Sequence, residues 1–149
     1  MCHYLYIGSD CPLPFFKSDE KEPLLSITPL SEEEQPVLQH FSKKYVVYAG
    51  AYEGCSCGFN YDFSDVEDNS TRQEEELKKS CVVLLLQYIK KQLLEARSLE
   101  VYNCWAGELN EKPQARRTID LANMQLGSAF WFEEKELVTF TDSSCPKDQ

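Results

Sequence analysis

The feature that most constrains the fold is a long amphipathic segment in the middle of the chain. Thr71 and Glu74 have the spacing of a helix-capping box, and the predicted helix runs from there to about Arg97. Apolar residues recur along it at intervals of three and four: Leu77, Cys81, Leu84, Leu85, Tyr88, Ile89 and Leu93. Further valine and leucine residues within 82–86 widen this stripe. Because so wide an apolar stripe must be buried, we expect the helix to lie flat against a sheet.

Strand-like segments lie on both sides of this helix. Runs rich in β-branched, aliphatic and aromatic residues predict strands at 2–7, 24–27, 43–52, 98–105, 116–121, 129–132 and 137–141. Ser31 and Glu34 have a second capping-box spacing, and Pro36 lies in the first turn, so this helix should be short and end near Phe41. Residues 11–23 contain three prolines and predict an irregular connector.

This order of elements predicts one α+β domain at residues 1–142, followed by a polar, frayed tail at 143–149. The sheet should be mixed, with five or six strands. The long helix should pack on one face of it, and the helix that starts at Ser31 should be a short second one.

The spacing of the strands predicts how they pair. The long helix lies between 43–52 and 98–105, so a right-handed crossover should place these two strands side by side and parallel. The later segments follow one another closely and should form antiparallel pairs. We expect a hairpin of 98–105 with 116–121, and a terminal hairpin of 129–132 with 137–141.

Composition disfavours several classes of function. The chain has 149 residues, of which 42% are hydrophobic and 27% charged, as in globular rather than disordered proteins. Its 25 acidic residues outnumber 15 Lys and Arg and leave a net charge of −10, which disfavours nucleic acid and favours a cationic partner. The apolar run at 81–86 is far too short to span a bilayer. We therefore expect neither a nucleic-acid nor a membrane partner.

Seven cysteines are many for a chain of this length. The N-terminal segment has no Lys/Arg-rich start and is interrupted by Asp10, Pro12 and Pro14, so no signal peptide is predicted and we expect a cytoplasmic protein. In a reducing compartment, an odd number of cysteines argues against a closed disulfide framework. The remaining interpretations are buried thiols, metal ligands or a redox pair.

Strand alternation predicts a shared face for two of the cysteines. Alternate residues of the strands 2–7 and 98–105 form an aromatic and polar set: Cys2, Tyr4, Tyr6, Glu100, Tyr102 and Cys104. The other set is mostly aliphatic and should meet the long helix. Cys2 and Cys104 would then lie together on the opposite face. Such a partly apolar and partly polar face is typical of a binding surface.

The sharpest local motif is Gly-Cys-Ser-Cys-Gly at 54–58. Its two thiolates suit zinc or copper(I), with Cys55 and Cys57 as the pair and Cys104 and Cys2 as completing ligands. The two histidines are weaker candidates. A lone Cys-x-Cys is not specific, however, and free thiols in a tight structural turn remain the competing interpretation. A redox pair is less favoured because the acidic surroundings raise the pKa of a thiol.

Two functions follow from these observations. The first is a soft-metal or other soft-ligand site at the Cys-x-Cys loop. The alternative is a non-catalytic acidic module, similar in principle to an inhibitor, that binds a basic protein partner in a salt-dependent way. We identify no catalytic residue, because neither a Gly-x-Ser-x-Gly elbow nor a phosphate-binding loop occurs. The sequence indicates no particular oligomeric state.

Three segments together resemble a small bacterial protein family of unknown function. They are MCHYLYIGSD at 1–10, GCSCGF at 54–59 and YNCWAG at 102–107. The resemblance covers residues 2 to about 141 and implies a single-domain bacterial protein. It implies no activity, substrate or cofactor.

Overall fold

The computed structural model describes residues 3–17, 24–52, 56–59, 69–124 and 132–144. Its elements, in chain order, are β1 (His3–Ser9), β2 (Phe16–Lys17), β3 (Ser26–Pro29), the 3-10 helix η1 (Glu32–His40), β4 (Tyr45–Gly50), η2 (Cys57–Phe59), α1 (Asn69–Gln92), β5 (Leu99–Trp105), β6 (Ala115–Asp120), η3 (Leu121–Asn123) and β7 (Glu136–Thr141). The fold is α+β, as predicted, but its mixed sheet has seven strands in the order β2-β3-β4-β1-β5-β7-β6.

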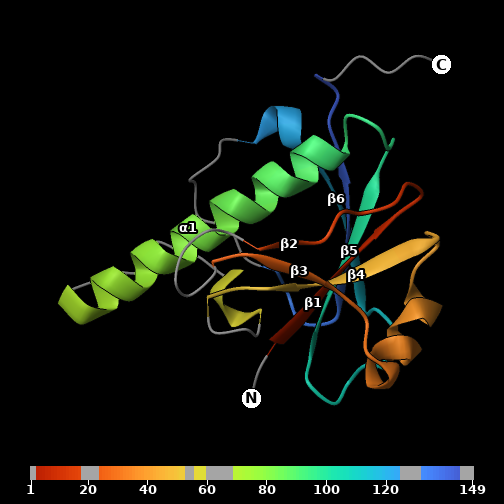
Figure 1. The fold of residues 1–149 in the computed structure, drawn as a ribbon, viewed down its shortest axis with the longest axis horizontal. Helices are drawn as coiled ribbons and strands as arrows, with labels where there is room; N and C mark the ends of the chain where they lie inside the picture. Colours follow the sequence, from red (N-terminus) through yellow and green to blue (C-terminus); the bar gives the residue numbers. More distant parts are fainter. Residues whose placement is uncertain (1–2, 18–23, 53–55, 60–68, 125–131, 145–149) are drawn as a thin grey trace.

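The long helix lies across one face of the sheet, as its apolar stripe predicts (Figure 1). Leu85 and Ile89 of α1 are fully buried in one cluster with Leu5 and Ile7 of β1. The helix begins two residues before the predicted start and ends at Gln92, short of the predicted end near Arg97. Among the described residues, no helix combines the length and the apolar character needed to cross a membrane.

The predicted parallel pairing of β4 with β5 is wrong, because β1 lies between them. Both strands are antiparallel to β1, so that Tyr6 is opposite Tyr48 on one side and Tyr102 on the other. The physical reason lies in β1 itself, whose residues 5–9 are fully buried. A strand buried on both faces must pair its backbone groups along both edges. The segment containing α1 therefore carries the chain past β1 to its far side.

The predicted hairpin of β5 with β6 is also wrong. β7 lies between the two, antiparallel to β5 and parallel to β6. Burial explains this order, since β7 carries the buried Val138 and Phe140 whereas most of β6 is exposed and suits a sheet edge. The other predicted partner of β7 is a strand at 129–132. Residues 129–131 lie outside the described residues, and Phe132 is buried but belongs to no strand.

The additional strand comes from the connector. β2 occupies part of the region predicted to be irregular and pairs with β3 at the outer edge of the sheet. The short helix ends at His40, as expected, and Glu34 accepts a hydrogen bond from the Ser31 backbone N–H at 3.0 Å. Figure 1 shows η1 on the side of the sheet away from α1. There its fully buried Val37 covers the aromatic face.

Candidate functional site

The serine of the Gly-Cys-Ser-Cys-Gly motif joins two strands. Ser56 is buried, and its Oγ accepts a hydrogen bond from the Leu5 N–H at 2.9 Å and donates one to the Ala49 carbonyl at 2.5 Å. Leu5 and Ala49 are the last pair of the β1–β4 ladder. The Ser56 N–H donates a hydrogen bond to the His3 carbonyl. The loop therefore pairs with the first residues of β1, which lie beyond the end of the β1–β4 ladder. This serine is a structural part of the sheet.

The rest of the described motif is also closely packed. A Cβ on Gly58 would lie 2.8 Å from the Ala51 Cβ and 2.9 Å from the Tyr52 ring, so only glycine fits there. Cys57 is half-buried, and its Sγ accepts a hydrogen bond from the His3 N–H at 3.2 Å. Phe59 belongs to the core beneath α1. These contacts support the interpretation of this loop as a structural turn.

Cys104 lies on the other face of the sheet, in the cluster beneath η1. The pKa of its thiol is raised to about 12, first by burial and then by the nearby Glu108 carboxylate, with Lys135 opposing the shift. The thiol therefore stays protonated near neutral pH. A metal ligand must be a thiolate, so this environment disfavours Cys104 in that role.

Two of the four predicted ligands, Cys57 and Cys104, have different surroundings. Cys57 belongs to η2, which packs against α1, whereas Cys104 faces η1. Cys2 and Cys55 lie outside the described residues. Within the described ranges, no group of three or more His, Cys, Asp or Glu side chains is placed to hold a metal ion. A soft-metal site at Cys55 and Cys57 stays a prediction.

The predicted division into two faces is confirmed, but the aromatic face is not an open surface. Tyr6 and Tyr102 are fully buried there. Their hydroxyls donate to the Glu34 carboxylate and the Glu111 carbonyl, each at 2.7 Å. Burial raises the pKa of both phenols, and for Tyr6 the Glu34 carboxylate raises it further. This face is a second core, in which both phenol hydroxyls are hydrogen-bonded within the protein.

An exposed apolar surface, which the sequence did not indicate, surrounds Phe15. This side chain keeps 64% of its surface exposed, and Phe16 keeps 41%. A groove of about 420 Å³ and a pocket of about 280 Å³ both include Phe15 in their walls. We call these two cavities and their walls the Phe15 surface.

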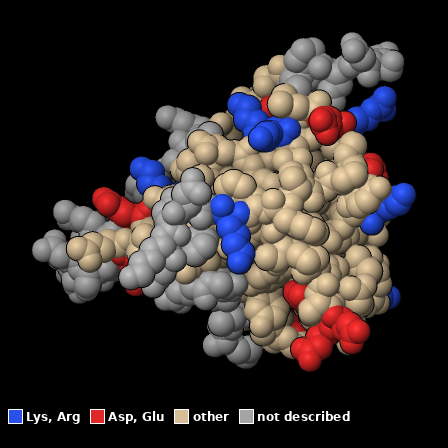
Figure 2. All heavy atoms as spheres, viewed as in Figure 1, with Lys and Arg blue, Asp and Glu red and all other residues tan. Residues whose placement is uncertain are grey.

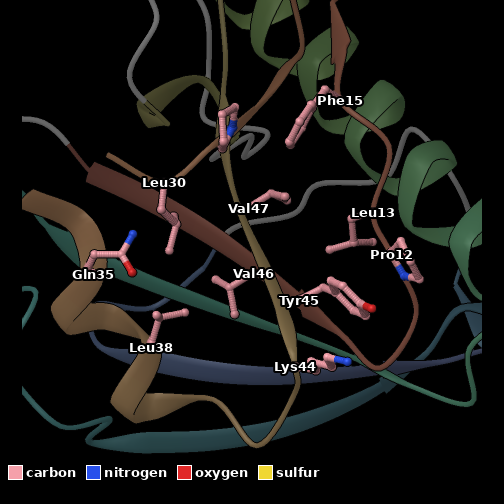
Figure 3. Close-up of a pocket in the computed structure, with 11 residues that line it drawn as sticks. Pro12, Leu13, Phe15, Leu30, Gln35, Leu38, Lys44, Tyr45, Val46 and Val47 are labelled. Atoms are coloured by element: carbon pink, nitrogen blue, oxygen red, sulfur yellow. The ribbon is translucent and has the colours of Figure 1, made fainter. Parts of the chain in front are cut away.

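The walls of the Phe15 surface come from five parts of the chain. Those of the groove are Pro12, Leu13, Phe15, Pro29, Leu30, Gln35, Leu38, Lys44, Tyr45, Val46 and Val47 (Figure 3). Those of the pocket are Pro14, Phe15, Phe16, Leu25, Leu84, Gln87, Tyr88, Lys91 and Gln92. The described lining supplies apolar contact and two ammonium groups, but no carboxylate, imidazole or thiol. Such a lining favours binding over acid–base or nucleophilic chemistry.

The segment that carries Phe15 is held in place. The Tyr88 hydroxyl of α1 donates a hydrogen bond to the Pro14 carbonyl at 2.8 Å, and Leu13 is buried in the core. Burial raises the pKa of the Tyr88 phenol, so the hydroxyl keeps the proton that it donates. Phe15 is therefore presented to solvent by an anchored backbone.

Comparison with known proteins adds no family to this description. No protein-family model matches the chain, and neither a curated protein nor a solved structure shows significant similarity to it.

We predict that Ser56→Ala lowers the free energy of unfolding by about 1–3 kcal/mol, because the buried Leu5 N–H loses its hydroxyl partner. Urea denaturation measures this change. Ser80→Ala, at an exposed position of α1, is the matched control and should change the free energy by less than about 0.5 kcal/mol. Equal stability of the two variants would contradict the structural role of Ser56.

We also predict that Cys104 resists alkylation by iodoacetamide at pH 8. A thiol with a pKa of about 12 has roughly a thousandfold smaller thiolate population there than one at the ordinary value of 9.0. Peptide mapping by mass spectrometry should show the half-buried Cys11 labelled far faster in the folded protein. Both should react similarly in urea. Labelling of Cys104 at the rate of Cys11 without urea would contradict its placement in the core.

The same labelling experiment examines the remaining metal-site prediction. Added zinc should protect Cys55 and Cys57 together if the two thiolates share a metal ion. Unchanged labelling of both would count against such a site.

Proposed function

We propose that the protein is a non-catalytic interaction module that binds another polypeptide through the Phe15 surface. The single observation that carries this proposal is the exposure of Phe15 between two cavities whose walls are formed mainly by residues with apolar side chains. A contiguous apolar area on a water-soluble surface commonly marks an interaction site. Aromatic side chains at such places are frequent anchors of protein interfaces.

The anchored backbone supports the proposal. The hydrogen bond from Tyr88 to the Pro14 carbonyl and the burial of Leu13 hold the segment immediately before Phe15. Pro12 and Pro14 further restrict its conformation. A surface that is ordered before the partner arrives loses less conformational entropy on binding.

The Phe15 surface differs in charge from the whole chain. The charged residues of its described walls are Lys44 and Lys91, whereas the chain has a net charge of −10. Figure 2 shows a broad uncharged area on one face, with Lys and Arg side chains around it, one of them near the centre of the view, and with Asp and Glu at the lower edge, the upper right and the left. The net charge of −10 favours a basic partner elsewhere on the surface, for example near the exposed Glu32 and Glu33 of η1. A basic partner therefore stays the alternative, and salt dependence distinguishes it from apolar docking.

We predict that Phe15→Ala removes the main partner of this chain. Tagged wild-type protein, Phe15→Ala and Leu94→Ala are used to capture proteins from extracts of the cells in which the chain is made. The side chain of Leu94 is 63% exposed and lies outside both cavities. Leu94→Ala is therefore the matched control, because it also removes an exposed apolar side chain. A partner retained by the wild type and Leu94→Ala should be reduced at least about fivefold with Phe15→Ala.

Repeating the capture experiment at higher salt concentration separates apolar docking from binding by net charge. Retention through the Phe15 surface should survive an increase from about 50 to about 500 mM salt, whereas a basic partner held by net charge should be released. Identical sets of captured proteins from the wild type and both variants would contradict the proposed function.

A further inference from the structure

The floor of the groove is an open edge of the sheet. β4 extends from Tyr45 to Gly50, but β3 pairs only with its residues 47–50. On the other side, β1 pairs with β4 as far as Tyr45. Backbone N–H and C=O groups alternate between the two sides of a strand, so either Tyr45 or Val46 directs both groups away from β1 and into the groove. Such an edge is a template for a further strand.

Both walls suit an extended chain. Figure 3 shows β4 running between Leu38 of η1 on one side and Leu13 of the Pro12–Phe15 segment on the other. Val46 points toward the η1 side, where it packs against the aromatic cluster. A peptide lying along this edge would place alternate side chains against the two walls. Only two residues of β4 are open, so apolar contact with the walls must supply most of the affinity.

The charged side chains of the Phe15 surface indicate the character of the occupant. Lys44 and Lys91 are the only charged residues among the described linings of both cavities. In a chain with 25 Asp and Glu residues, a lining whose described residues include two lysines and no Asp or Glu is electrostatically complementary to an acidic ligand. The Lys44 Nζ lies 5.3 Å from the centre of the Tyr45 ring, next to the open edge.

We infer that the occupant is an extended apolar segment of another protein that carries Asp or Glu side chains and adds a short strand to β4. This inference rests on the proposed function and specifies its mode and its partner chemistry. A second copy of this chain is disfavoured, because a symmetric pairing would bring two lysine-bearing rims together. Recognition by strand addition derives its affinity from backbone hydrogen bonds and its specificity from pockets for alternate side chains.

A random ten-residue peptide library displayed on phage, selected against the full chain, tests this inference. Enriched peptides should combine alternating apolar residues with Asp or Glu. Their affinity should fall at least about tenfold with Phe15→Ala and be unchanged with Leu94→Ala. Lys44→Glu should weaken them about five- to tenfold, whereas Lys79→Glu, at an exposed position of α1 outside both cavities, should leave them unaffected. Circular dichroism confirms that each variant is folded.

Methylation of the peptide backbone tests strand pairing directly. Each amide of an enriched peptide is methylated in turn. We expect methylation at one amide to weaken binding at least about tenfold, and methylation at its two neighbours to have far smaller effects, because their N–H groups point away from β4. Equal effects at all positions would overturn strand addition.

The remaining outcomes separate this inference from the proposed function. Peptides that need Phe15 but are insensitive to both methylation and Lys44→Glu would overturn the inference and leave the binding function intact. Failure to enrich any Phe15-dependent peptide would also overturn it, while the capture experiment would decide the binding function independently. A dimer in analytical ultracentrifugation that Phe15→Ala dissociates would identify a second copy as the occupant, and would equally overturn the inference.

Discussion

The structure depends on the position of β1 at the centre of the sheet. This strand pairs with β4 along one edge and with β5 along the other, and each of its two faces is buried in a separate apolar cluster. Leu5 and Ile7 pack beneath α1, while Tyr6 lies beneath η1. One strand thereby creates an aliphatic core and an aromatic core. Cys104 lies in the aromatic core, whereas the Cys57 thiol accepts a hydrogen bond from the His3 N–H, and among the described residues neither belongs to a cluster that could hold a metal ion.

The Phe15 surface is a consequence of strands with unequal lengths. β3 ends at Pro29, opposite Val47 of β4, and the chain then turns away into η1. β4 extends beyond this pair to its first residue, Tyr45. The connector after β1 passes on the far side of this open edge, anchored through Pro14 to α1. The result is a groove that is lined mainly by residues with apolar side chains and bordered by the open edge of β4. Its features come from segments distant in sequence, and the exposed aromatic ring is held where a partner can reach it.

Local patterns predicted the elements well, because alternation and helical periodicity are properties of neighbouring residues. The two faces of β1 and β5, the apolar side of α1 and the end of η1 were all visible in this way. The order of β5, β7 and β6 was not, since it depends on which strand is buried most deeply. Arg117 of β6, for example, pairs with the buried Glu136 of β7 at 2.8 Å, a contact that depends on this strand order. The surface around Phe15 was missed because two phenylalanines in a proline-rich connector have no periodicity to indicate whether they are buried.

Site-specific photocrosslinking tests the central claim most directly. Benzoylphenylalanine is incorporated in place of Phe15 in one protein and in place of Leu94 in another, and both are irradiated in the cells that make them. The binding function predicts a crosslinked polypeptide from position 15 and none of that mass from position 94, although the two sites are almost equally exposed. The same crosslinked species from both positions, or none from position 15, would contradict it.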